Sequence, residues 1–242
     1  MIAGMIWNAG TVARRRGAPW MRVAMASAGI LLIANADLLA HGVSARDKAF
    51  MEQGGLLAFL YLGAKHMVTG YDHLLFLLGV IFFLYRLRDV GAYVTLFAVG
   101  HSVTLLYGVL SGTHVNAYLI DAIIGLSVVY KALDNLGAFR QWFGVQPNTK
   151  AAVLIFGFFH GFGLATKMQD FALPTIGLVG KIVAFNAGVE IGQLLALTVI
   201  LLAMAYWRRT ARFERQAFAS NVVIMTCGFL LMGYQLTGYF LE

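Results

Sequence analysis

The stretch that decides the fold reads His66-Met67-Val68-Thr69-Gly70-Tyr71-Asp72-His73 and continues into Leu74-Leu75-Phe76-Leu77. It places two imidazoles and a carboxylate at the mouth of a strongly apolar segment. Ionisable groups in or beside hydrocarbon are costly unless they pair, face water or bind an ion, so they mark a functional site by default. Three later apolar segments repeat the pattern, with His101, with His160 and with the set Asn186, Glu190 and Gln193. The sequence therefore predicts that the protein functions inside a membrane.

The composition is that of a polytopic membrane protein. Of the 242 residues, 60% are hydrophobic and only 12% are charged, and the mean hydropathy is +0.76. Several apolar runs reach the roughly 20 residues needed to cross a bilayer. The net charge of +7 does not indicate nucleic-acid binding, because the basic residues stand in short clusters beside the apolar runs, as membrane topology requires. The single cysteine, Cys227, excludes an intrachain disulfide.

Residues 1–40 are expected to be a signal peptide. Its parts are a basic region (Arg14, Arg15, Arg16 and Arg22), an apolar run at 23–33 and a small residue at Ala40. The alternative is an uncleaved amino-terminal helix, because Leu38 stands where a small residue is preferred. Cleavage would make His41 the mature amino terminus, where its amine and ring together could chelate a metal. Residues 41–242 are expected to form a single transmembrane domain.

The predicted fold class is all-α, a polytopic bundle of about six transmembrane helices. The expected spans are 71–88, 91–110, 117–134, 151–167, 181–206 and 221–241. The segment 55–69 is too short to cross at about 1.5 Å per residue, and is expected to be a half-helix or a re-entrant piece. Lys and Arg residues gather at loops 135–150 and 207–220, whereas loops 111–116 and 168–180 contain almost none. This bias places the first two loops in the cytoplasm and both mature termini outside.

The candidate site is a set of metal ligands or proton-relay groups. Its members are His66, Asp72, His73, His101, His160, Asn186, Glu190, Gln193 and His41. Neutral imidazole suits divalent first-row metals such as nickel, copper and zinc, and a carboxylate supplies negative charge. Asn186, Glu190 and Gln193 recur at i, i+4 and i+7, so a helix would place them in one stripe.

Each polar residue also has a simpler interpretation. A lone histidine in a membrane helix is often only an interhelical hydrogen-bond partner, and His114 in its loop is expected to be solvated. Asp121 is expected to be an interfacial residue, and Lys131 with Asp134 an i, i+3 ion pair. A neutral residue could hold helices together as well as Glu190 does, so this carboxylate favours the functional interpretation.

The motifs occur in the order His66-x5-Asp72-His73, Gly100-His101-Ser102-Val103-Thr104-Leu105, Phe159-His160-Gly161-Phe162-Gly163 and Phe185-Asn186-Ala187-Gly188-Val189-Glu190-Ile191-Gly192-Gln193. In these motifs the chain resembles the HupE/UreJ family of membrane proteins over about residues 41–241. The resemblance implies a small six-helix permease with a cleaved signal peptide, nickel delivery to hydrogenase and urease systems, and functional roles for the His-Asp-His motif and the later His and Glu residues. After His160 the chain continues Gly-Phe-Gly-Leu-Ala, so it lacks the second histidine of the first-described nickel permeases, and the metal stays open.

The expected function is an inner-membrane permease for a divalent transition metal, nickel first, with cobalt, zinc or copper as alternatives. The ion would be captured from outside near His66, Asp72 and His73 and pass to a midplane site. The chain has no Gly-x4-Gly-Lys-Ser/Thr run, so transport would be facilitated or ion-coupled. Two other functions stay open: a membrane-embedded metal-binding enzyme or metalloenzyme accessory protein, and a structural subunit. The expected partners are the metal ion and the lipid bilayer, with a second copy of the chain or metalloenzyme maturation proteins as further candidates and no nucleic acid.

Overall fold

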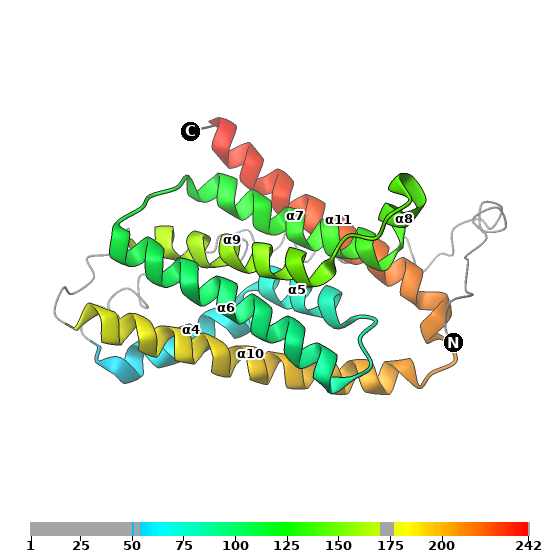
Figure 1. Cartoon of the computed structure of the whole chain (residues 1–242), viewed down its shortest axis with the longest axis horizontal. Coiled ribbons are helices and arrows are strands. Elements are labelled where there is room, and N and C mark those ends of the chain that lie inside the picture. The colour runs from blue at the N-terminus through cyan, green and yellow to red at the C-terminus, as the bar shows by residue number, and fades with distance from the viewer. Residues whose placement is uncertain (1–49, 51–53, 170–176, 242) are drawn as a thin grey trace.

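A computed structural model describes residue 50 and residues 54–169 and 177–241, and all secondary structure in these ranges is helical (Figure 1). The helices are α4 (Leu56–Thr69), α5 (Tyr71–Ile81), α6 (Leu87–Ser111), α7 (Ala117–Asn135), α8 (Ala138–Phe143), α9 (Thr149–Gln169), α10 (Leu178–Arg208) and α11 (Phe213–Leu241). The expected all-α fold class is confirmed. The expected signal peptide at 1–40 and the candidate ligand His41 lie outside the described residues.

Four helices are long and apolar enough to cross a bilayer by length and composition. They are α6, α9, α10 and α11, which contain 25, 21, 31 and 29 residues. The 19 residues of α7 would cover about 28 Å, close to the hydrocarbon thickness, although this helix also contains Asp121, Lys131 and Asp134. The chain is therefore a membrane protein, and the count of six crossings stays a prediction.

Six helices pack in close pairs: α4 against α10, α6 against α9, and α7 against α11. Small residues permit the close approach. A Cβ atom at Gly188 would overlap the carbonyl oxygen of Leu60 on α4, and one at Gly100 would lie 2.6 Å from the carbonyl oxygen of Leu154 on α9. Without a side chain the two backbones come into van der Waals contact, which is how helices associate in lipid. The short helix α5 contacts α4, α7, α10 and α11 and lies in the middle of the bundle (Figure 1).

The segment α4–α5 is a broken helix. The expected short helix at 55–69 is present as α4. Gly70, with an extended backbone (φ −72°, ψ 107°), separates it from α5. The expected continuous span 71–88 is wrong, because α5 ends at Ile81 after 11 residues, or about 16 Å. In Figure 1 α4 and α5 follow one another through the bundle, and their 14 and 11 residues together rise about 37 Å, enough for one crossing.

Arg208, at the end of α10, binds the turn that follows α5. Its guanidinium donates hydrogen bonds to the carbonyl oxygens of Phe82 and Leu84, each at 2.9 Å, and to that of Ile81. Only Ile81 of these three residues belongs to α5, and its carbonyl also accepts the backbone N–H of Leu84, so the cation mainly holds the turn that follows the helix. The same turn moves the start of α6 to Leu87, four residues before the expected 91.

Other helix ends differ from the expected ones by a few residues. The last helix begins at Phe213 instead of 221, because Phe213 and Ala217 are buried against the core and extend the apolar face. The expected i, i+3 pair is confirmed: the Lys131 Nζ atom lies 2.5 Å from Asp134 Oδ2. The carboxylate of Asp134 also accepts hydrogen bonds from Gln146 and Thr149, which fix the segment between α8 and α9 to the end of α7.

Candidate metal centre

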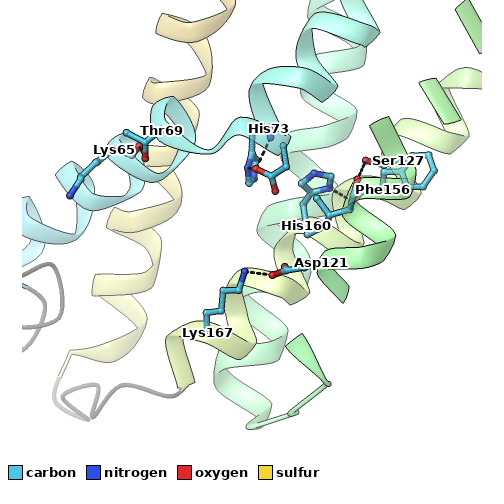
Figure 2. Close-up of polar contacts among 10 residues, drawn as sticks. Lys65, Thr69, His73, Asp121, Ser127, Phe156, His160 and Lys167 are labelled. Atoms are coloured by element: carbon cyan, nitrogen blue, oxygen red, sulfur yellow. Dashed lines mark hydrogen bonds and ion pairs between the residues drawn. The ribbon is translucent and has the colours of Figure 1, made fainter. Parts of the chain in front are cut away.

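Four histidines from four helices converge beside the break at Gly70. His73 of α5 is central: its ring centroid lies 5.0 Å from that of His66 on α4, 4.9 Å from that of His160 on α9 and 6.3 Å from that of His101 on α6. His73, His101 and His160 are buried, with at most 3% of each residue exposed. Figure 2 shows the side chains of His73 and His160 pointing toward one another from different helices. The structure thus brings all four described candidate histidines together.

Asp72 completes the cluster. Its Oδ1 atom lies 2.8 Å from Nδ1 of His73 and also accepts the backbone N–H of His73 at 2.7 Å. One ligand atom each from Asp72, His73 and His160 all lie within 4.8 Å of one another. In a tetrahedral site with bonds of about 2.1 Å, two ligand atoms stand about 3.4 Å apart. Side-chain movements of less than about 1 Å would therefore place all three around one ion.

Hydrogen bonds to Nδ1 prepare two of the rings for metal binding. The Nδ1 atom of His73 faces the Asp72 carboxylate, and Nδ1 of His160 lies 2.8 Å from the carbonyl oxygen of Phe156. A carbonyl oxygen can only accept, so His160 donates from Nδ1 and the lone pair of the ring is on Nε2. Metal-binding histidines commonly have this second interaction, which fixes both tautomer and ring orientation.

Three further candidates have polar atoms in the interior. Both ring nitrogens of His101, Oδ1 of Asn186 and Nε2 of Gln193 are buried with no hydrogen-bond partner among the described residues. Buried polar groups normally have partners, and exceptions call for an ion or water that meets them. The ring of His101 stacks on Phe97, and Thr104, one turn later on α6, donates a 2.8 Å hydrogen bond to the Phe158 carbonyl of α9. This interhelical bond holds α6 and α9 together beside His101 and His160.

Glu190 does not join the cluster. Asn186 and Gln193 are 9% and 1% exposed, whereas Glu190 between them is exposed on the outer surface of α10. The three residues do form one stripe of α10, about 60° wide, but Glu190 at its edge points away from the interior. The buried face of α10 is fixed by Gly188 and Gly192, which contact the α4 backbone. With about 100° per residue, Glu190 lies about 40° beyond Asn186 on the side away from that contact.

Gly70 is required here for space and not for its backbone angle. Its φ of −72° is accessible to any residue. A Cβ atom at this position would lie 2.8 Å from Nδ1 of His73 and 3.1 Å from Oδ1 of Asp72. A larger residue would displace the ring and the carboxylate that orients it.

One pair of polar side chains near the cluster was not expected to face it. Asp121 of α7, predicted to be interfacial, forms an ion pair of 2.6 Å with Lys167 of α9, and the two side chains are only 10% and 15% exposed (Figure 2). The carboxylate also lines a small cavity together with Asp72. The sequence indicated this site only through the carboxylate of Asp121 inside an apolar helix. Its position near Asp72 depends on how the helices pack.

Comparison with known proteins agrees with this arrangement. The family model described as HupE / UreJ protein matches residues 44–242. The chain belongs to the HupE/UreJ family. No curated protein and no solved structure matches it. Membership of the HupE/UreJ family implies a membrane accessory or permease role related to nickel or cobalt, and the ligand atoms of Asp72, His73 and His160 lie close enough together that they could hold a metal ion.

Proposed function

We propose that this HupE/UreJ protein is an inner-membrane permease for a divalent transition metal, with nickel first and cobalt next. One observation carries the proposal: ligand atoms of Asp72, His73 and His160 lie within 4.8 Å of one another in the interior of an apolar helix bundle. Two imidazoles and one carboxylate suit nickel, cobalt, copper or zinc. The carboxylate offsets part of the charge of a dication, which eases its loss of water.

The neighbouring polar groups supply a path. His66 on the α4 side of the break and His101 on α6 extend the cluster in two directions, and the amides of Asn186 and Gln193 offer further ligands along α10. The ion would exchange its water for these nitrogen and oxygen atoms one after another. Glu190 has a place in the path only if a movement of α10, or a partner, brings its exposed carboxylate inward.

The proposed topology has six crossings, with α4 and α5 sharing the first. Loops 135–150 and 207–220 lie in the cytoplasm, and both mature termini lie outside, after removal of residues 1–40. Metalloenzyme maturation proteins and a second copy of the chain are the proposed protein partners. The energy source would be the ion gradient alone or a coupled ion.

A second function, a metal-holding accessory protein or enzyme, is favoured by the depth of the cluster. His73 and His160 are 3% and 1% exposed, so a bound ion would leave slowly without a conformational change. Transport predicts repeated passage of ions, whereas a resident metal predicts one ion retained per chain.

Uptake of radioactive nickel, cobalt and zinc by cells that express the protein separates these functions, when combined with elemental analysis of the purified protein. A permease accumulates at least one of the three metals above the level of cells without the protein, and His73→Ala and His160→Ala abolish the accumulation at unchanged expression. No accumulation, together with one metal retained per purified chain, would favour the accessory or enzyme function. Absence of both would leave the cluster as helix packing and contradict the proposal.

A further inference from the structure

A second polar site adjoins the histidine cluster. A small cavity of about 10 Å³, roughly the room that one water molecule needs, lies between α5, α7 and α11. Asp72, Asp121 and Gln235 provide its polar lining, and Ile124, Gly125 and Leu231 the apolar remainder. Asp72 therefore belongs to both the cavity and the histidine cluster.

Gln235 is an independent indication of a ligand. It is 7% exposed, it lines the cavity, and its side-chain amide makes no hydrogen bond within the described ranges. An unpaired amide in an apolar interior is costly unless something in the cavity meets it. Its amide oxygen and the two carboxylates form an all-oxygen set, in contrast to the imidazoles of the histidine cluster that Asp72 also joins.

The charge at Asp121 is balanced by a side chain that a cation can replace. Lys167 holds Asp121 at 2.6 Å, and Lys167 follows His160 on α9 by about two helical turns, or about 10 Å. Asp121 lies one turn from the start of α7, whose preceding loop is proposed to face outside. The ion pair thus stands between the helix ends and the histidine cluster, as Figure 2 shows.

We propose that Asp121, Gln235 and Asp72 form an outer cation subsite that a divalent ion occupies before the histidine cluster, and that the Lys167 ammonium neutralises Asp121 when the ion is absent. This inference rests on the proposed metal-handling function and extends it by one step. A buried carboxylate without a counter-charge is strongly disfavoured, so Lys167 holds the subsite closed until a dication displaces it. Oxygen ligands retain a partly hydrated ion, and Asp72 then passes it to nitrogen ligands.

Mn²⁺ is the probe of choice for the oxygen subsite, because carboxylate, carbonyl and water oxygens suit this ion. Its binding to the purified full-length protein in detergent is measured by electron paramagnetic resonance. Co²⁺ reports on the histidine cluster through its visible absorption. We expect Gln235→Leu and the double variant Asp121→Asn/Lys167→Gln to weaken Mn²⁺ binding about tenfold or more, as loss of a supporting ligand typically does. Lys167→Gln alone should strengthen it, because the competing ammonium is gone.

The double variant removes both charges together, so it leaves no buried charge unpaired and should fold. Its matched control is Lys131→Gln/Asp134→Asn, which removes the other ion pair of α7 and should leave Mn²⁺ binding unchanged. Equal Mn²⁺ affinity in the wild type and in Asp121→Asn/Lys167→Gln overturns the subsite. So does weaker binding by Lys167→Gln, since Lys167 would then support the site instead of competing with the ion.

The proposed function fails in a different way. His160→Ala should remove the Co²⁺ absorption and leave Mn²⁺ binding in place. A Co²⁺ signal that survives in both His73→Ala and His160→Ala counts against the histidine centre, while Mn²⁺ binding that depends on Asp121 would still establish the outer subsite.

Discussion

The rings of His73 and His160 lie 4.9 Å apart although they belong to helices that are distant in the sequence. The contact depends on the short helix α5, which begins directly after the break at Gly70 and presents His73 in its first turn. A straight helix through Gly70 would carry the ring in a different direction. The break is therefore part of the site.

The first prediction concerns the ligands. We expect His73→Ala and His160→Ala to weaken binding of nickel or cobalt to the purified protein by about 100-fold, and Asp72→Asn by about 10–100-fold, because Asp72 orients a ligand even where it does not bind the ion. Isothermal titration calorimetry measures the affinities. His114→Ala, in the exposed loop between α6 and α7, is the control and should bind as the wild type does. Equal losses in all four variants would point to an effect on folding.

Glu190 provides the second prediction. Interpreted from the sequence alone, Glu190→Gln should abolish metal accumulation. Its exposed position in the structure predicts instead that the purified Glu190→Gln variant retains wild-type metal affinity, since its carboxylate is not part of the group of ligand atoms formed by Asp72, His73 and His160. A loss of uptake with intact binding would assign Glu190 to a later step or to a partner surface. A loss of binding would mean that α10 rotates to bring Glu190 inward.

Helix packing gives the third prediction, through two glycines in long helices. Gly188→Ala should lower stability by about 1–3 kcal/mol, because the added Cβ overlaps the Leu60 carbonyl and forces α4 away from α10. Gly233→Ala has open space around its Cβ and should raise stability by about 0.5–1 kcal/mol, since alanine is the better helix former. Thermal unfolding in detergent compares the two. Similar midpoints for both variants would contradict the tight α4–α10 contact.

The fourth prediction concerns the turn after α5. Arg208→Gln removes a cation that satisfies three backbone carbonyls, and buried groups left without a partner cost about 1–3 kcal/mol. We expect a lower unfolding midpoint and weaker metal binding, because α5 holds both Asp72 and His73. Arg209→Gln, at the neighbouring exposed position, should change neither. If Arg209→Gln lowered the unfolding midpoint and metal binding more than Arg208→Gln, the role of Arg208 would be limited to the membrane surface.

A fifth prediction concerns topology. With Cys227 replaced by Ala, single cysteines at Val145 and at Thr113 are labelled from opposite sides of the membrane, the first only after permeabilisation of the cells. Mass spectrometry of the same samples tests removal of residues 1–40. Labelling of the 145 position in intact cells would reverse the proposed orientation and place the Asp121 end of α7 toward the cytoplasm.

The sequence singled out Asp72, His73 and His160 because charge and hydropathy conflict sharply there, and the structure brings the three together. The helical class could be predicted because several apolar runs are long enough to cross a bilayer as helices. Orientation about a helix axis could not be predicted in this way. In a membrane protein both the lipid-facing and the buried face are apolar, so hydropathy around Glu190 did not indicate which face of α10 contacts α4. That choice is made by Gly188 and Gly192 in three dimensions.

Long-range contacts explain the other differences. The apolar residues after Ile81 continue the helical pattern, yet α5 ends there in a turn that Arg208, from a helix far along the chain, binds through hydrogen bonds. Gln235 in an apolar helix was not expected to line a site, because its significance depends on Asp72 and Asp121 across the cavity. Features of this kind become visible only once the helices are packed.

The two short helices that meet at Gly70 also shape the electric field of the site. The carboxyl end of α4 carries partial negative charge and the amino end of α5 partial positive charge, each equivalent to about half an elementary charge. The start of α5 stabilises the Asp72 carboxylate and at the same time repels a cation bound to it, while the end of α4, beside His66, attracts one. An ion at the break would thus be drawn toward one half-helix and pushed from the other.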